Sequence, residues 1–153
     1  MTQPEGDINV VRQGAEDGEA ESQFWLAVSY HTGKGIAKDG EQAVIWYRKA
    51  AEQNHTPAQF NLAMLYYLGN GVPKDFSETA KWMTRAAEQG EPASQNTLAV
   101  LYFNGEGVEK NIDEAIKWWR RSAENGNSKA QVSLGAMYYD GKGVEQDMVQ
   151  ALM

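Results

Sequence analysis

Apolar residues recur along the chain at two superimposed spacings. Over short distances they lie three or four residues apart, as Leu62, Ala63 and Tyr66 do, which places their side chains on one face of a helix. Over longer distances the pattern returns every 36 residues without an insertion, as from Gly33 to Gly69. The same register aligns leucines and tyrosines, at Leu26, Leu62, Leu98 and Leu134 and at Tyr30, Tyr66, Tyr102 and Tyr138. The sequence therefore predicts an array of helical repeats.

Each repeat predicts two helices, which we call helix A and helix B. Residues 57–68 form one helix A, and Gly69 ends it because glycine readily adopts the left-handed conformation that closes a helix. Asp75 then caps a helix B that continues to about Glu88, and Glu78 completes a capping box. The capping pair recurs at Asp39/Gln42, Asn111/Glu114 and Asp147/Gln150.

A helical hairpin of this size buries its apolar face only against neighbouring hairpins. We therefore expect an all-α fold, a right-handed α/α solenoid of 36-residue helix-turn-helix repeats, as counted from Gly69 to Gly105. Trp46, Trp82 and Trp118 are predicted to be structural residues on the inner face of helix B.

The repeats predict a single domain over residues 7–153, preceded by a disordered tail at 1–6. Its expected parts are an N-terminal half-repeat at 7–21, repeats at 22–57, 58–93 and 94–129, and an incomplete fourth repeat at 130–153. In the half-repeat Val10 stands at the tryptophan position. Because repeat arrays need terminal caps, we expect either a longer protein or pairing of the incomplete end with another chain.

Taken together, the motifs resemble the Sel-like repeat (SLR) family, a bacterial relative of tetratricopeptide repeats. The matching pattern is Ala-x-x-x-Leu-Ala-x-x-Tyr-x-x-Gly-x-Gly-Val-x-x-Asp, then Trp-x-x-x-Ala-Ala-Glu-x-Gly, and it extends from about Asp7 to the end. The resemblance implies an α/α superhelix that serves as an adaptor or scaffold. Thr79 and Ser94 depart from it by replacing alanines, and Gly14 lies within the first helix, where glycine costs about 1 kcal/mol relative to alanine.

The second face of helix A is the candidate binding surface. In the related tetratricopeptide architecture the corresponding positions line a concave groove, so the resemblance places there Phe24, Val28, His31, Phe60, Met64, Tyr67, Leu68, Val100, Phe103, Asn104, Val132 and Tyr139. The rings of His31, Tyr67, Phe103 and Tyr139 form a ladder suited to an apolar or amphipathic peptide or helix of a partner protein. Alternatively, these rings fill space between adjacent helices.

Charge narrows the class of partner. With 21 acidic and 14 basic residues the net charge is -7, which disfavours nucleic acid and anionic membranes and favours a neutral or basic protein. The helix A faces carry almost no Lys or Arg, so the groove is predicted to be apolar and neutral to acidic, unlike a two-cation carboxylate clamp. The start of the chain has no basic and apolar leader pattern, so we expect a soluble protein, cytoplasmic by default, with the periplasm left open.

Catalytic patterns are weak. The Gly69-x-Gly71 motif follows a helix and lacks the lysine of a phosphate-binding loop, and cysteine is absent. The histidines, His31 and His55, lie in different repeats, so we predict no enzyme, metal site or cofactor. Two alternatives to a binding scaffold remain: a β-lactam-binding or weakly hydrolytic enzyme, like cysteine-rich relatives in the family, or a purely architectural segment of a longer array.

Overall fold

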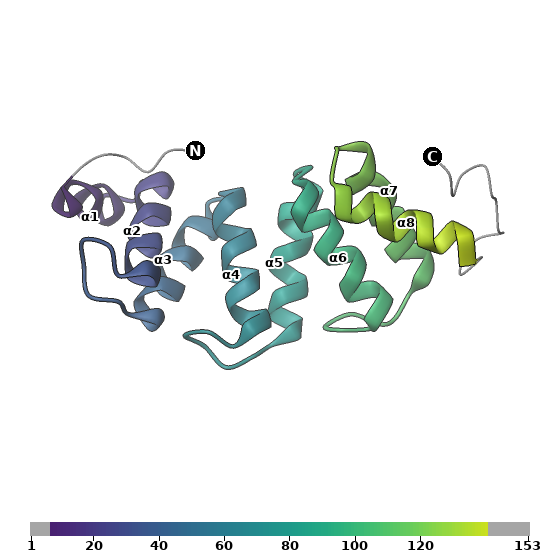
Figure 1. Cartoon of the computed structure of the whole chain (residues 1–153). Helices are drawn as coiled ribbons and strands as arrows, with labels where there is room; N and C mark the ends of the chain where they lie inside the picture. Colours follow the sequence, from purple (N-terminus) through teal and green to yellow (C-terminus); the bar gives the residue numbers. More distant parts are fainter. Residues whose placement is uncertain (1–6, 141–153) are drawn as a thin grey trace. The chain divides into compact units, whose positions relative to one another are not determined.

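The computed structural model describes residues 7–140, whose regular secondary structure is entirely α-helical (Figure 1). The helices A are α2 (Ala20–Thr32), α4 (Thr56–Leu68), α6 (Pro92–Asn104) and α8 (Ser128–Asp140). The helices B are α1 (Ile8–Glu16), α3 (Gly40–Glu52), α5 (Phe76–Glu88) and α7 (Ile112–Glu124). The predicted all-α fold of helix-turn-helix repeats is confirmed, and α4 and α5 lie within a residue of their expected bounds.

The chain divides into two compact units, Met1–Trp82 and Met83–Met153. In the first unit α2 packs against α1 and α3, and α3 packs against α4. In the second unit α7 packs against α6 and α8. The predicted single domain stays a prediction, while the tail at 1–6 and the partial helix B at Asp147–Met153 lie outside the described residues.

Glycine ends each of the first three helices A as predicted. Gly33, Gly69 and Gly105 have φ values of 78°, 68° and 69°, in the left-handed region. The N–H of Gly69 donates to the carbonyl of Leu65, as is typical of a helix C-cap. A residue with a Cβ would be strained at these positions, so the turn into each helix B depends on glycine.

The helix B caps confirm one half of the predicted capping box. Asp39, Asp75 and Asn111 accept hydrogen bonds from the backbone N–H three residues later, at 3.2, 3.1 and 3.1 Å. The Glu78 carboxylate makes other contacts than the expected one, since it accepts from Trp82 Nε1 at 3.1 Å and lies 3.9 Å from Arg48. The N–H of Asp75 instead donates to the carbonyl of Tyr66. Glu78 thus ties α5 to α3.

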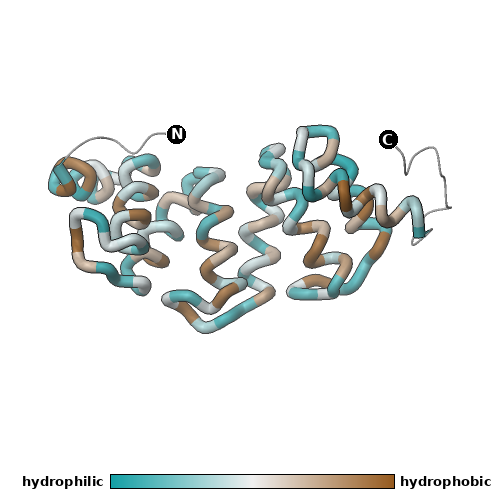
Figure 2. The backbone as a smooth tube through the Cα atoms, viewed as in Figure 1, coloured by the Kyte–Doolittle hydropathy of each residue, from teal (hydrophilic) through white to brown (hydrophobic). Residues whose placement is uncertain are grey.

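The tryptophan position of helix B is buried to different extents in different repeats, contrary to the prediction that all three tryptophans lie on an inner face. Trp82 and Trp118 are 1% and 6% exposed, whereas Trp46 is only half-buried and Val10 is 69% exposed. The residue after the tryptophan position is buried in every described helix B, namely Val11, Tyr47, Met83 and Trp119. A helix B such as α3 packs against helices A on both sides, so two adjacent positions share its burial. Hydrophobic and hydrophilic positions accordingly alternate along the helices in Figure 2.

A buried glutamine joins each helix A to the preceding helix B, a feature that the sequence analysis missed. Gln23, Gln59 and Gln95 are at most 5% exposed, and each Nε2 donates to the carbonyl of an alanine eight residues earlier, at 3.1 to 3.2 Å. On α8 Gln131 makes the same bond but is exposed. A buried amide needs such a partner, so this bond fixes how the helices meet.

The glycine inside α1 has a packing reason. A Cβ built at Gly14 would lie 2.4 Å from Ser22 Oγ and 2.9 Å from Ser22 Cβ on α2. Helices α1 and α2 therefore approach too closely for alanine here, which accounts for the poor helix former at this position.

Candidate functional site

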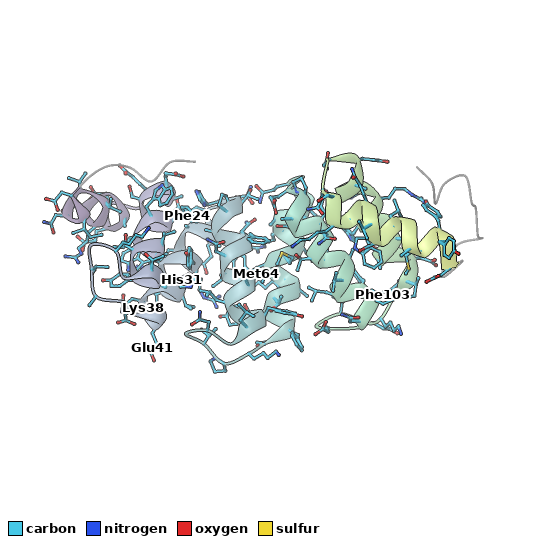
Figure 3. All side chains as sticks on the ribbon, in the orientation of Figure 1. Phe24, His31, Lys38, Glu41, Met64 and Phe103 are labelled. Carbon is cyan, nitrogen blue, oxygen red and sulfur yellow. The ribbon has the colours of Figure 1, made fainter. Side chains whose placement is uncertain are left out.

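We call the predicted binding positions on the helices A the ring face. It differs from the inner face of the same helix: Leu62 and Ala63 are fully buried and Tyr66 is 9% exposed, whereas Phe60, Met64 and Tyr67 are half-buried. Met64 of α4, Phe103 of α6, and Phe24 and His31 of α2 are labelled in Figure 3. The helix A therefore has one face in the core and one partly accessible face.

On α2 the ring face is mostly covered. Phe24 is 7% exposed, and its ring centroid lies 5.9 Å from that of Tyr47 and 4.9 Å from that of His55. Val28 and His31 are half-buried, and the His31 ring meets the edge of Tyr47 at 6.3 Å. Phe24 is thus a core residue with little surface for a partner.

On α4 the ring face is more open. Leu68 is 64% exposed, and the half-buried Tyr67 packs on Phe76 at the start of α5 with 5.4 Å between centroids. The ammonium of Lys74 lies 5.9 Å from the Tyr67 centroid and 4.9 Å from that of Phe76. The helix carries no cation on this face, as predicted, but the loop after it brings one beside the rings.

In the second unit Val100 and Phe103 of α6 are half-buried, and Phe103 lies 5.6 Å from the Trp119 ring of α7. Asn104 is exposed and donates from Nδ2 to Glu106 Oε1 at 2.9 Å. On α8, Val132 and Tyr139 are 74% and 57% exposed. The exposed apolar area of this unit is therefore concentrated on α8.

Two polar atoms near the ring face of the second unit are buried without a hydrogen-bond partner among the described residues. They are Oδ1 of Asn96, which stands where Phe60 stands in α4, and Nε1 of Trp119. An unmet buried group costs about 1–3 kcal/mol. Repeats with aromatic or apolar residues at these positions avoid that cost.

The start of α4 is coupled electrostatically to α2 through His55 and Glu21. His55 caps α4, since its Nδ1 accepts the N–H of Ala58 at 3.2 Å, and its Nε2 lies 2.8 Å from Glu21 Oε2. The hydrogen bond from His55 lowers the pKa of Glu21, although burial opposes the shift, and Trp25 Nε1 lowers it further. On the neighbouring helix, burial raises the pKa of Tyr47, against a hydrogen bond from Asn61.

We next consider metal binding and membrane insertion for residues 7–140. No group of three or more His, Asp or Glu side chains there has the arrangement of a metal site. No helix in this part of the chain is both long and apolar enough to cross a membrane. The features found so far define a helical repeat protein of the α/α solenoid class.

The chain belongs to the Sel1 repeat family, whose model matches residues 20–55, 56–91, 92–127 and 128–153. Each match opens at or beside the first residue of a helix A, two residues before the repeat bounds predicted above. The family resemblance is confirmed. Proteins built from Sel1 repeats are generally protein-interaction scaffolds, most of them without catalytic activity.

Solved structures of the same kind resemble this one. A protective antigen of uropathogenic Escherichia coli with an SLR fold is 40% identical over 95% of this chain, with a TM-score of 0.91. A Sel1 repeat protein from Oxalobacter formigenes is 37% identical over 95% of this chain, also with a TM-score of 0.91. The chain spans only 31% and 60% of those two proteins. The comparison with curated proteins found no match.

A more distant structure shares the fold alone. Cysteine rich protein B of Helicobacter pylori is 22% identical over 81% of this chain and 92% of its own, with a TM-score of 0.65.

Sequence reasoning missed the side chains that support the ring face. Tyr47, Phe76 and Trp119 come from helix B, and each contacts one ring of the predicted ladder. For Tyr47 and Trp119 the sequence signal was an aromatic residue next to the tryptophan position, as in Trp46-Tyr47 and Trp118-Trp119, whereas Phe76 lies at the start of α5 and has no such signal.

Proposed function

We propose that the ring face binds an apolar or amphipathic segment, a peptide or a helix, of a partner protein, and that the protein acts as a scaffold or adaptor. The observation that supports this most is the uneven burial of helix A. On α4 the inner face is sealed, while Tyr67 is half-buried and Leu68 is 64% exposed. Partly exposed rings beside an exposed aliphatic side chain suit a hydrophobic anchor.

Support by helix B makes these rings suitable for binding. His31, Tyr67 and Phe103 each rest on a second aromatic ring, at centroid distances of 6.3, 5.4 and 5.6 Å. A side chain already held in one orientation loses little conformational entropy when a partner covers it. The contact with a helix B ring therefore fixes the orientation of each ladder ring before a partner binds.

The expected partner is neutral or basic overall, because the chain carries a net charge of -7. Lys74 adds a local cation at the edge of the ring face, 4.9 Å from Phe76. A bound segment that is apolar along the rings and carries an acidic or carbonyl group at that edge fits both observations.

Site-specific photo-crosslinking tests the proposal. A benzoylphenylalanine residue replaces Leu68 on the ring face or, as a matched control, Ile45, which is 44% exposed on α3. We expect crosslinked partner protein from position 68 and not from position 45, and we expect Tyr67→Ala to reduce the yield of crosslinked partner from position 68. Equal crosslinking at both positions would rule out the ring face, and silence at both would favour an architectural segment.

A second proposed interaction is self-association of the chain through α8. Val132 and Tyr139 make α8 the most exposed apolar surface among the described residues. Self-association there would raise the sedimentation coefficient as the protein concentration rises, and Val132→Ser would reverse that increase.

We also propose that the protein binds without catalysis. Turnover of a chromogenic β-lactam by the purified protein, abolished by one side-chain change, would contradict this.

A further inference from the structure

An arginine–tyrosine pair recurs where a helix B meets the next helix A. In the first unit Arg48 of α3 donates to the hydroxyl of Tyr66 on α4. In the second unit Arg120 of α7 donates from Nε to the hydroxyl of Tyr138 on α8 at 3.0 Å. In both pairs the guanidinium carbon lies 5.7 Å from the tyrosine ring centroid. The guanidinium therefore hydrogen-bonds the hydroxyl and also lies within the range of a cation–π contact with the ring.

The corresponding pair on α5 and α6 lacks its arginine. Tyr102 occupies the tyrosine position, but Thr84 occupies the arginine position, 18 residues before it as Arg48 is before Tyr66. A threonine side chain is much shorter and carries no charge. Tyr66 and Tyr138 are 9% and 8% exposed, whereas Tyr102 is half-buried. Tyr102 is thus more accessible than the two tyrosines that accept a hydrogen bond from an arginine, and it is half-buried like Tyr30 of α2.

Two carboxylates act on Tyr102 through their negative charge. Burial raises the pKa of Tyr102, and the carboxylates of Glu114 and Glu88 raise it further. In the first unit the counterpart of Glu114 is Glu78, which lies 3.9 Å from the Arg48 guanidinium. Tyr102 and Glu114 are therefore the same pair of groups that contacts a guanidinium one repeat earlier.

One cation already lies near this position. Lys117 Nζ is 3.8 Å from Glu114 Oε1, with side chains that are 50% and 35% exposed. An exposed pair of this kind contributes at most about 1 kcal/mol and is readily exchanged. A lysine ammonium also cannot stack on the Tyr102 ring and donate to two acceptors in one plane.

We propose that Tyr102, Glu114 and Glu88 bind an arginine side chain of a partner protein, in the place that Arg48 and Arg120 fill in the other repeats. This surface lies on the tyrosine positions of the inner face and not on the ring face, so it does not depend on the function proposed above. An acidic chain that captures one arginine gains orientation as well as affinity, because the planar guanidinium must match ring, hydroxyl and carboxylate together.

Titration of the whole chain with N-acetyl-arginine methylamide, followed by amide chemical shifts, tests the site. We expect saturable shifts around Tyr102 and Glu114 with a dissociation constant on the order of millimolar, as befits one side chain. The lysine analogue should bind more weakly and the neutral citrulline analogue should not bind. Equal shifts from arginine and citrulline, or none from either, would overturn the proposal.

Substitution of Thr84 distinguishes this site from general attraction to an acidic protein. Thr84→Arg should supply the guanidinium from within the chain and abolish binding of the arginine analogue, while Thr84→Ser should leave it unchanged. Should Thr84→Arg fold poorly, Tyr102→Phe decides, because it removes only the hydroxyl and should weaken binding several-fold. If Thr84→Arg and Tyr102→Phe both bound the arginine analogue as well as the unsubstituted chain does, the proposed site would be wrong.

Discussion

The inner face and the ring face of helix A differ in how far they repeat. On the inner face α4 and α6 present the same fully buried residues, Leu62 and Leu98. On the ring face they differ, with Phe60 in α4 where Asn96 stands in α6. Stacking of neighbouring repeats demands one shape at every inner face, because each must fill the same space. The ring face is free of that demand, so its side chains differ from one repeat to the next.

We expect the largest loss of stability from a substitution that disrupts the packing of the buried helix B residues. Trp82→Ala removes a side chain that is 1% exposed and should lower the free energy of unfolding by about 3–5 kcal/mol, through lost burial and the cavity left behind. Trp46→Ala, at the same repeat position but half-buried, is the matched control and should cost clearly less. Urea unfolding of both variants measures the difference, and equal losses would contradict the burial assigned to the two rings.

The polar member of the inner face gives the next largest effect. Gln59→Ala should cost about 1–3 kcal/mol, because it removes a fully buried side chain whose Nε2 donates to the Ala51 carbonyl at 3.1 Å and to Asn54 Oδ1 at 3.2 Å. Gln131→Ala removes the equivalent bond on α8, where the side chain is exposed, and should cost less. Thermal unfolding of the pair checks whether burial or the bond itself determines the loss.

On the ring face we expect a substitution to affect partner binding more than stability. Tyr67→Ala loses one ring contact at 5.4 Å, worth about 0.5–1.5 kcal/mol, and should leave the fold intact while it weakens partner binding. Unfolding measurements and crosslinking from position 68 provide the two readouts. If Tyr67→Ala destabilised the chain as much as Trp82→Ala, its ring would belong to the core.

The smallest effect is electrostatic and concerns the junction of α2 and α4. Since the pKa of Glu21 is lowered in the folded state, its ionised form stabilises the fold above the ordinary value of 4.5, and this contribution is lost as the pH falls through the folded pKa. Solvent screening keeps it small, because the Glu21 side chain is 54% exposed. Glu21→Gln should flatten the fall in melting temperature between about pH 5 and 3, whereas Glu52→Gln, on an exposed position of α3, should not.

Most of the fold could be predicted from periodicity. The ends of α4 followed from apolar spacing and Gly69, because a left-handed glycine is a local property of the chain. The caps of the helices A are less regular than those of the helices B: His55 caps α4 and Asn127 caps α8, whereas α2 has no side-chain cap. A cap depends on where a side chain points, and the sequence places that only to within a residue or two.

The candidate site was less accessible to prediction. The ring-face positions remain a prediction carried over from a resemblance, and for Phe24 the structure places the ring in the core, against Tyr47 and His55. Spacing identifies residues that share a face of one helix, but it does not show which neighbouring side chains cover that face. Burial at Phe24 depends on a histidine more than thirty residues later in the sequence.

The sequence by itself determined that the chain repeats every 36 residues, from Gly33 to Gly69 and from Gly69 to Gly105, and that each repeat is a pair of helices. These properties follow from local spacing and from backbone preferences of single residues. Only the tertiary structure decided that Tyr47 is buried while Trp46 is half-buried, and that Arg48 hydrogen-bonds the hydroxyl of Tyr66. Such differences arise where separate helices meet, and the contacts made there depend on every side chain brought together.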